Sequence, residues 1–388
     1  MTTKSDVPIW SLHPLDYHTV PTHLAYDTQV ITLATPVVAP SVRLRLSNAF
    51  GTQPLVFTAA TVQDAAAPDA AALPVTQGGG ATLTVPAGGV LDSDAIGLTG
   101  SGPHRLTVTL TAVAATVETL TWTYDKTLVQ VAHRDAAGAA VASRDLFALA
   151  ANDPHALVLY GLQALLVPAP APRRLIALGD SITQQGYFLG ALAQNWPGLA
   201  IVNLGVSGNR VLRDTDPSQG VGNQYGTAAV NRAAGELAAC GAGPQDLAVV
   251  LLGINDLVQP GPWAPVEQEV PVAALLAGFA KLQAIVAAAR VPAVVSTLLP
   301  FGGSDYHTPA REAVRQTLNQ AIVAGRFGAS VDLAAAVADP QDPTRDLAEN
   351  DSGDHVHPTP AAGALMARQL AAAPAVAAWL KGGRHATR

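Results

Sequence analysis

Three side chains that together can perform nucleophilic catalysis occur in this sequence, at Ser181, Asp354 and His357. A serine hydroxyl is a weak nucleophile until a base removes its proton, and a histidine is a better base when a carboxylate orients it. Asp354 and His357 stand just before Thr359 and Pro360, which have the residue types of a helix N-cap and first helical position. The pair can therefore fold back on itself within one turn, with Ser181 as the nucleophile.

Donors for the charge of a tetrahedral intermediate follow other apolar runs of the chain. Such a charge is usually stabilised by backbone amides together with a side-chain amide. The backbone amides of Ser181 and Gly208 and the carboxamide of Asn255 are the candidates, and glycine at position 208 leaves its N–H sterically open. We therefore expect these three residues to form an oxyanion hole.

Each of these residues also has a structural alternative. Ser181 could cap the helix that follows it, and Asn255 could simply occupy a turn. Asp354, His355 and His357 could ligate a metal, but zinc normally needs three or four protein ligands and the other histidines lack ligand-like spacing. The sequence also lacks a dinucleotide fingerprint and a Gly-Lys pair for a phosphate loop. We expect neither a metal nor a cofactor.

Two long irregular segments, 213–226 and 258–271, are rich in Gly, Pro, Asp and Gln, and such loops often form the rim of a binding site. Arg210 could contact substrate or pair with a nearby aspartate, and the aromatic side chains could simply pack. The residues expected around a substrate are Asn209, Arg210, Tyr225, Trp263, Phe301 and Tyr306.

The pattern of apolar and polar residues, which indicates the elements that position these side chains, changes near residue 170. After it, apolar runs alternate with Ala-rich stretches of helix length, which predicts a buried parallel sheet with helices on both faces. In such a doubly wound α/β domain, sites lie at the carboxyl ends of the strands, and Ser181, Gly208 and Asn255 each follow such a run. The expected strands cover 175–178, 200–204, 247–252, 293–299 and 330–333.

The first part of the chain has a different pattern, in which apolar and polar residues alternate in short runs bounded by Gly, Pro, Asp and Asn. This predicts an antiparallel, jelly-roll-like β-sandwich as an accessory domain over 1–167. The Pro- and Ala-rich segment 168–172 predicts a stiff linker, and the α/β domain then covers 173–383. The alternating runs are 42–46, 55–62, 81–85, 106–110 and 120–124.

Composition excludes several classes of protein. The chain has 388 residues, 49% hydrophobic and 13% charged, with a net charge of −7. This balance predicts a compact chain and disfavours binding to nucleic acid or to a membrane. The start lacks the apolar core of a signal peptide, so a cytoplasmic location is expected unless the chain has been trimmed. One cysteine, Cys240, allows no internal disulfide, and the oligomeric state stays open.

The residues singled out above resemble the SGNH, or GDSL-type, hydrolase family over about residues 173–372. The resemblance rests on four ordered blocks: Gly-Asp-Ser at 179–181, Asn203-x-Gly-x-x-Gly208, Gly253-x-Asn255-Asp256 and Asp354-x-x-His357. It implies a three-layer SGNH hydrolase fold with a Ser181, Asp354 and His357 triad. Ile182 replaces the leucine of the usual Gly-Asp-Ser-Leu tag.

Three further segments resemble a narrower group, the two-part bacterial esterases associated with xylan, aryl or carbohydrate esters. These segments are Leu46 to Gly51, Thr297 to Gly303 with Tyr306, and Ser352 to His357. The resemblance implies a carboxylic ester hydrolase, EC 3.1.1, that cleaves short-chain esters, acetyl esters above all, of carbohydrates or aryl alcohols. The alternative is a carbohydrate-binding or scaffolding protein with a vestigial hydrolase domain.

Overall fold

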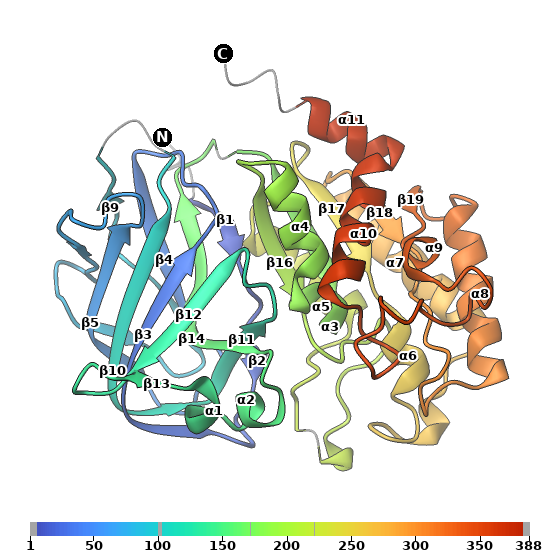
Figure 1. Cartoon of the computed structure of the whole chain (residues 1–388), viewed down its shortest axis with the longest axis horizontal. Coiled ribbons are helices and arrows are strands. Elements are labelled where there is room, and N and C mark those ends of the chain that lie inside the picture. Colours follow the sequence, from blue (N-terminus) through green and yellow to red (C-terminus); the bar gives the residue numbers. More distant parts are fainter. Residues whose placement is uncertain (1–5, 100–102, 171, 221, 383–388) are drawn as a thin grey trace. The chain divides into compact units, whose positions relative to one another are not determined.

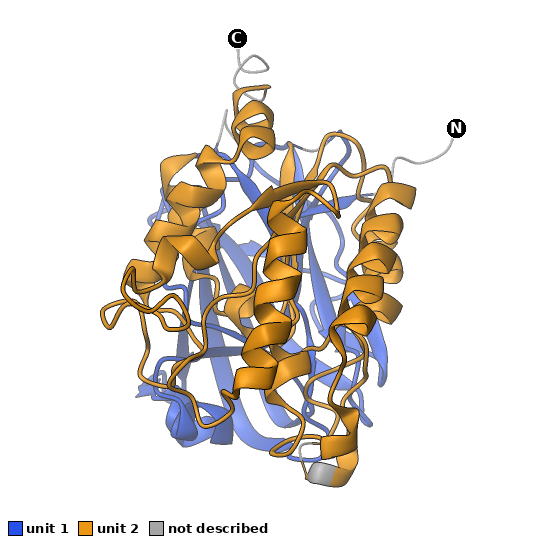
Figure 2. Ribbon diagram, turned by 90° about the vertical axis from the view of Figure 1, so that its right-hand side faces the viewer, with its two compact units in different colours: residues 1–172, 197–202 blue, residues 173–196, 203–388 orange. Residues whose placement is uncertain are grey.

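The computed structural model describes residues 6–99, 103–170, 172–220 and 222–382. Its chain forms two compact units, one of residues 1–172 with 197–202 and one of residues 173–196 with 203–388 (Figure 2). The helices and strands of both units are labelled in Figure 1. Each unit is described by itself below.

One sheet of the first unit is antiparallel throughout its pairings, in the order β13-β12-β3-β10-β5-β6, with β7 beside β5. Strands β3 and β10 bury every second residue along much of their length, so the alternating sequence pattern sends apolar side chains to one face. The strands are β3 (Thr22–Leu33), β5 (Leu55–Asp64), β6 (Leu73–Pro74), β7 (Leu83–Val85), β10 (Leu106–Val117), β12 (Val129–Arg134) and β13 (Ala140–Val141).

The second group of strands in this unit centres on β14 (Leu157–Val167), which pairs antiparallel with β1, β4 and β11. Sequence alternation did not reveal β14, because almost every residue of this strand is buried and its apolar run is continuous. The other elements here are β1 (Val7–Ser11), β2 (Leu15–Asp16), β4 (Ser41–Asn48), β8 (Gly89–Asp92), β9 (Ile96–Gly97), β11 (Thr119–Thr123), α1 (Ser143–Leu146) and α2 (Ala148–Asn152). The jelly-roll-like sandwich stays a prediction.

A buried polar cluster links the two sheets of this unit. His133 Nδ1 lies 2.9 Å from Asp27 Oδ2, and the Tyr160 hydroxyl donates to the same oxygen over 3.1 Å. His133 Nε2 lies 3.2 Å from the Val158 carbonyl oxygen, so both ring nitrogens face acceptors. Both side chains of this pair are almost fully buried, 0% exposed for His133 and 1% for Asp27. These hydrogen bonds therefore connect β12 and β3 of one sheet to β14 of the other.

We expect His133→Ala to lower the free energy of unfolding by about 3 kcal/mol, because it leaves the buried Asp27 carboxylate without its hydrogen-bond partner on β12. Urea unfolding followed by circular dichroism measures the change. His23→Ala, at an exposed histidine of β3, is the matched control. Equal unfolding midpoints for the two variants would contradict the stabilising role of the cluster.

The second unit contains strands in the order β15-β17-β18-β19, and the end of β16, residues 203–205, lies beside β15 in this unit. Strands β15, β17, β18 and β19 pair in parallel in that order, and every residue of β15 and β17 is buried, as their continuous apolar runs predict. The chain leaves β15 for β16 on one side and later returns to β17 on the other, which creates a topological switch point. The strands are β15 (Arg174–Gly179), β16 (Ala200–Gly205), β17 (Leu247–Leu251), β18 (Ala293–Ser296) and β19 (Ala329–Val331).

Helices of this unit form two packed groups, α4 with α10 and α5 with α7 and α8. Together with the sheet they make the mixed α/β fold that the sequence predicts. In the described part of the chain no single helix is long and apolar enough to cross a membrane, although the bent pair α10 and α11 passes on length and composition alone. The helices are α3 (Ser181–Gln185), α4 (Tyr187–Asn195), α5 (Ala229–Ala239), α6 (Ile254–Val258), α7 (Val272–Ala288), α8 (Pro309–Val323), α9 (Ala334–Val337), α10 (Pro360–Ala372) and α11 (Pro374–Gly382), with short 3₁₀ turns at Pro217–Gln219 and Val266–Gln268.

Candidate active site

Ser181 is the first residue of α3 and follows β15 after a single residue, Asp180. The Asp180 carboxylate caps the helix, since its Oδ1 accepts the backbone N–H of Ile182 over 3.1 Å. The capping role considered for Ser181 therefore belongs to Asp180. A side chain at Gly179 would lie 1.8 Å from Thr183 Oγ1, so the tight strand-to-helix turn requires glycine there.

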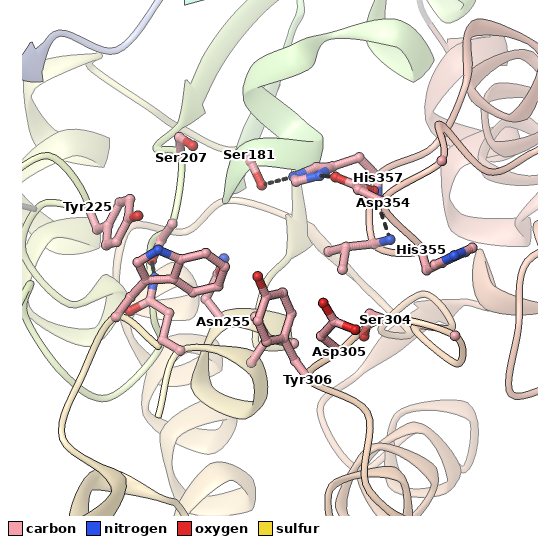
Figure 3. Close-up of a pocket in the computed structure, with 17 residues that line it drawn as sticks. Ser181, Ser207, Tyr225, Asn255, Ser304, Asp305, Tyr306, Asp354, His355 and His357 are labelled. Atoms are coloured by element: carbon pink, nitrogen blue, oxygen red, sulfur yellow. Dashed lines mark hydrogen bonds and ion pairs between the residues drawn. The ribbon is translucent and has the colours of Figure 1, made fainter. Parts of the chain in front are cut away.

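A line of hydrogen bonds joins Ser181 to His357 and Asp354 (Figure 3). The Ser181 Oγ lies 2.7 Å from His357 Nε2, and His357 Nδ1 lies 2.5 Å from Asp354 Oδ2. Burial alone would raise the pKa of Asp354, but its hydrogen bond to His357, the charge of that ring and two backbone amides hold this pKa well below its ordinary value. The arrangement is that of a nucleophile, a base and a carboxylate that orients the base.

The loop that carries His357 is held by two aspartates. Asp354 Oδ1 accepts the backbone N–H groups of Val356 and His357, and Asp351 Oδ1 accepts those of Gly353 and His355. Four amides of a short irregular segment are thus satisfied by its own side chains. The loop leads directly into α10, whose N-cap is Thr359 and whose first residue is Pro360, as the sequence predicts.

Gly208, on the loop after β16, has φ +72°, a conformation that favours glycine. A side chain there would lie 2.1 Å from Tyr225 Cδ1. The carbonyl oxygen of Gly208 accepts the side-chain amide of Gln259, and Asn255 Nδ2 donates to the Asn209 carbonyl over 3.2 Å. Because a carboxamide carries two N–H donors, Asn255 keeps a second one available.

The Asp256 side chain fixes the loop that follows β16 and carries Gly208. Its carboxylate accepts the backbone N–H of Val211 over 2.7 Å and that of Leu212 over 3.2 Å. Burial raises the pKa of Asp256 to about 6, against the lowering effect of these two amides. Burial likewise raises the pKa of Asp180 to about 7. Both buried carboxylates act on backbone amides, which suits structural roles beside the candidate nucleophile and the Gly208 loop.

A cavity of about 610 Å³ contains the predicted nucleophile, base, carboxylate and oxyanion donors. Of the predicted rim residues, Tyr225, Trp263 and Tyr306 also line it. The rings of Trp263 and Tyr306 lie 4.8 Å apart at 57°. The structure therefore collects five predicted site residues and three predicted rim residues in one place.

The other three predicted rim residues lie outside the cavity lining. Asn209 is fully buried, and its Nδ2 donates to the carbonyls of Tyr225 and Thr227. Arg210 donates to the side chain of Gln268 and to a backbone carbonyl. Phe301 is fully buried. These three side chains make internal contacts.

Several lining residues were missed in the sequence. They include Ser207, Gln259, Asp305 and His355, together with Val258, Gly303, Ser304, Gly353 and Val356. Most belong to the segments that follow the strand ends, so the rule that sites lie at carboxyl ends of parallel strands could have found them. Within the described residues, no group of three or more His, Cys, Asp or Glu side chains is placed to hold a metal ion.

The oxyanion role predicted for Asn255 from the sequence implies that Asn255→Ala lowers kcat by about 10²- to 10³-fold with little change in KM. Steady-state kinetics on an activated acetyl ester measures it. Asn195→Ala, at an exposed residue of α4, is the control. Equal kcat values for the two variants would show that Asn255 is only a turn residue.

Comparison with known protein families finds a match that includes the candidate nucleophile, base and carboxylate. The GDSL-like lipase/acylhydrolase family matches residues 177–365. No curated protein matches the chain.

Similar solved structures include a variant of Axe2, an acetyl xylan esterase from Geobacillus stearothermophilus, with 21% identity and a TM-score of 0.39 over 51% of this chain and 93% of that one. A putative acylhydrolase from Bacteroides fragilis has 16% identity and a TM-score of 0.40 over 55% of this chain and 92% of that one. LAE5, an alpha/beta hydrolase from the metagenome of Lake Arreo, has 19% identity and a TM-score of 0.40 over 53% and 96%. The match over residues 177–365 supports an SGNH, or GDSL-type, hydrolase.

Proposed function

We propose that this protein is a serine esterase that hydrolyses carboxylic esters through an acyl-enzyme on Ser181. The observation that carries the proposal is the line of hydrogen bonds from Asp354 through His357 to Ser181, at the wall of the cavity. A binding protein would not need these three side chains in contact. The family supports hydrolase chemistry.

In the first half of the reaction, Ser181 Oγ attacks the ester carbonyl while His357 Nε2 takes the hydroxyl proton. Asp354 keeps the other ring nitrogen protonated and stabilises the imidazolium. The backbone amides of Ser181 and Gly208 and the side-chain amide of Asn255 hold the oxyanion. The intermediate collapses, the bond to the alcohol oxygen breaks, and His357 returns its proton to the leaving alcohol.

In the second half, water enters the space that the alcohol has left. His357 takes a proton from this water as its oxygen attacks the acyl carbon. The bond from that carbon to Ser181 Oγ then breaks, His357 returns the proton to the serine, and a carboxylic acid is released. No cofactor is needed for either half.

We propose short-chain acyl esters, acetyl esters above all, of carbohydrates or aryl alcohols as substrates. The aromatic side chains of Tyr225, Trp263 and Tyr306 line the cavity, and aromatic rings suit the flat faces of sugar or aryl rings. Polar side chains of Ser207 and Ser304 also line the cavity and supply hydrogen-bonding groups.

The test is hydrolysis of p-nitrophenyl esters of increasing acyl length, with intact-mass detection of a fluorophosphonate adduct. We expect turnover that is fastest for acetate and one adduct per chain. Turnover that is fastest for long chains would overturn the short-chain part of the proposal. A folded protein that neither turns over these esters nor reacts would favour a carbohydrate-binding or scaffolding role with a vestigial site.

We expect activity to fall as the pH falls, because His357 must be unprotonated to accept the serine proton. The low pKa of Asp354 keeps this carboxylate charged across the same range, so its titration does not contribute to the fall. The measurement is a profile of kcat/KM against pH. An activity that stays constant down to about pH 4, where imidazoles are ordinarily protonated, would contradict the assignment of His357 as the base.

A further inference from the structure

The permanently charged side chains in the described lining of the cavity are all negative. Apart from tyrosines, the ionisable residues among its described lining are Asp305, Asp354, His355 and His357, and none is a lysine or arginine. Asp354 is engaged by His357. The cavity therefore has acidic groups and no permanent cation in its wall.

Asp305 lies on the loop after β18, two residues beyond Gly303, and is exposed. Figure 3 shows its carboxylate turned toward the cavity. No other described residue forms a hydrogen bond or an ion pair with this carboxylate. Its charge is therefore available to whatever enters the cavity.

Arginines of neighbouring elements do not compensate this charge, because their own partners occupy them. Arg311 lies 2.7 Å from Glu269, and Arg315 lies 2.6 Å from Glu312. Arg210, which the sequence offered as a substrate contact, donates instead to Gln268 and to a backbone carbonyl, and the carboxylates of Asp214, Asp216 and Asp256 act on its charge. None of these arginines pairs with Asp305, so its carboxylate adds an uncompensated negative charge to the potential in the cavity.

We propose that Asp305 sets the charge selectivity of this pocket, which accepts neutral and cationic esters and rejects esters with a negative charge near the reacting carbonyl. The inference rests on the proposed esterase function. A free carboxylate repels an anionic substrate most strongly in a confined site. The ring faces of Trp263 and Tyr306 act in the same direction, since the faces of aromatic rings attract cations and disfavour anions.

Two sets of matched esters test the proposal. Charge on the alcohol side is varied with para-acetoxybenzoate, its methyl ester and para-acetoxyphenyl-trimethylammonium, which share the acetyl group. Charge on the acyl side is varied with mono-p-nitrophenyl adipate against p-nitrophenyl hexanoate. The quantity measured is the ratio of kcat/KM values for the anionic and neutral members, at low and high salt.

We expect the wild type to prefer the neutral member by about tenfold in at least one set, and high salt to reduce this preference. Asp305→Asn should bring the ratio toward unity, whereas Asp305→Glu should keep it. Glu267→Gln makes the same change of net charge at an exposed residue outside the cavity lining and should keep the wild-type ratio.

Equal ratios for the wild type and Asp305→Asn, with the neutral esters still hydrolysed, would overturn the role of Asp305 and leave the esterase function intact. An equal loss of preference in Glu267→Gln would also overturn it, because net charge alone would then explain the effect. Absence of turnover on every ester, together with absence of a fluorophosphonate adduct, would instead overturn the proposed function and this inference with it.

Discussion

Ser181→Ala is expected to reduce kcat for an activated acetyl ester by at least about 10⁴-fold and to abolish the fluorophosphonate adduct. The alanine removes the only atom that can form the acyl-enzyme, while the amides of the oxyanion hole remain and supply a small residual rate. Among the described residues the Oγ forms one hydrogen bond, to His357, so the variant is expected to fold. Initial rates and intact mass of the treated protein measure both effects.

Ser218→Ala is the matched control, because Ser218 is an exposed residue in a 3₁₀ turn outside the cavity lining. It should keep full activity and full labelling. Labelling of Ser181→Ala at the wild-type rate would place the nucleophile elsewhere and overturn the acyl-enzyme proposal.

Asp354→Asn is expected to lower kcat by about 10⁴-fold with a small change in stability. The asparagine oxygen can still accept the amides of Val356 and His357, so the loop keeps its shape. Its NH₂ group, however, donates to His357 Nδ1 and forces the proton onto Nε2. The ring nitrogen beside Ser181 then cannot accept the serine proton.

The measurement is kcat over a range of pH, with thermal unfolding recorded in parallel. Asp69→Asn, at an exposed residue of the first unit, is the control for loss of one negative charge. A variant Asp354→Asn with near wild-type kcat would show that this carboxylate only shapes the loop. A variant that unfolds at room temperature would contradict the expected small change in stability.

Features that depend on residues close together in the chain were predictable from sequence. Continuous apolar runs predicted the buried strands β15, β16 and β17 almost to the residue. Thr359 and Pro360 predicted the start of α10. The contact between Asp354 and His357 is likewise local, since the two residues are three apart and one turn brings them together.

The Ala293 run shows where such reasoning fails. The predicted strand covers 293–299, but β18 ends at Ser296. The backbone N–H of Leu298 bonds the side chain of Asn319 on α8 instead of a neighbouring strand. A strand ends where its hydrogen-bond partner ends, and composition does not carry that information.

The sequence by itself determined which residue types could do chemistry and which local turns present them. Only the tertiary structure decided which of them meet, because those contacts join distant segments through the sheet. The bond between Ser181 and His357 spans 176 positions, and that between Gln259 and Gly208 spans 51. Whether a polar side chain faces the cavity, as Asp305 does, or an internal partner, as Arg210 does, depends on such packing.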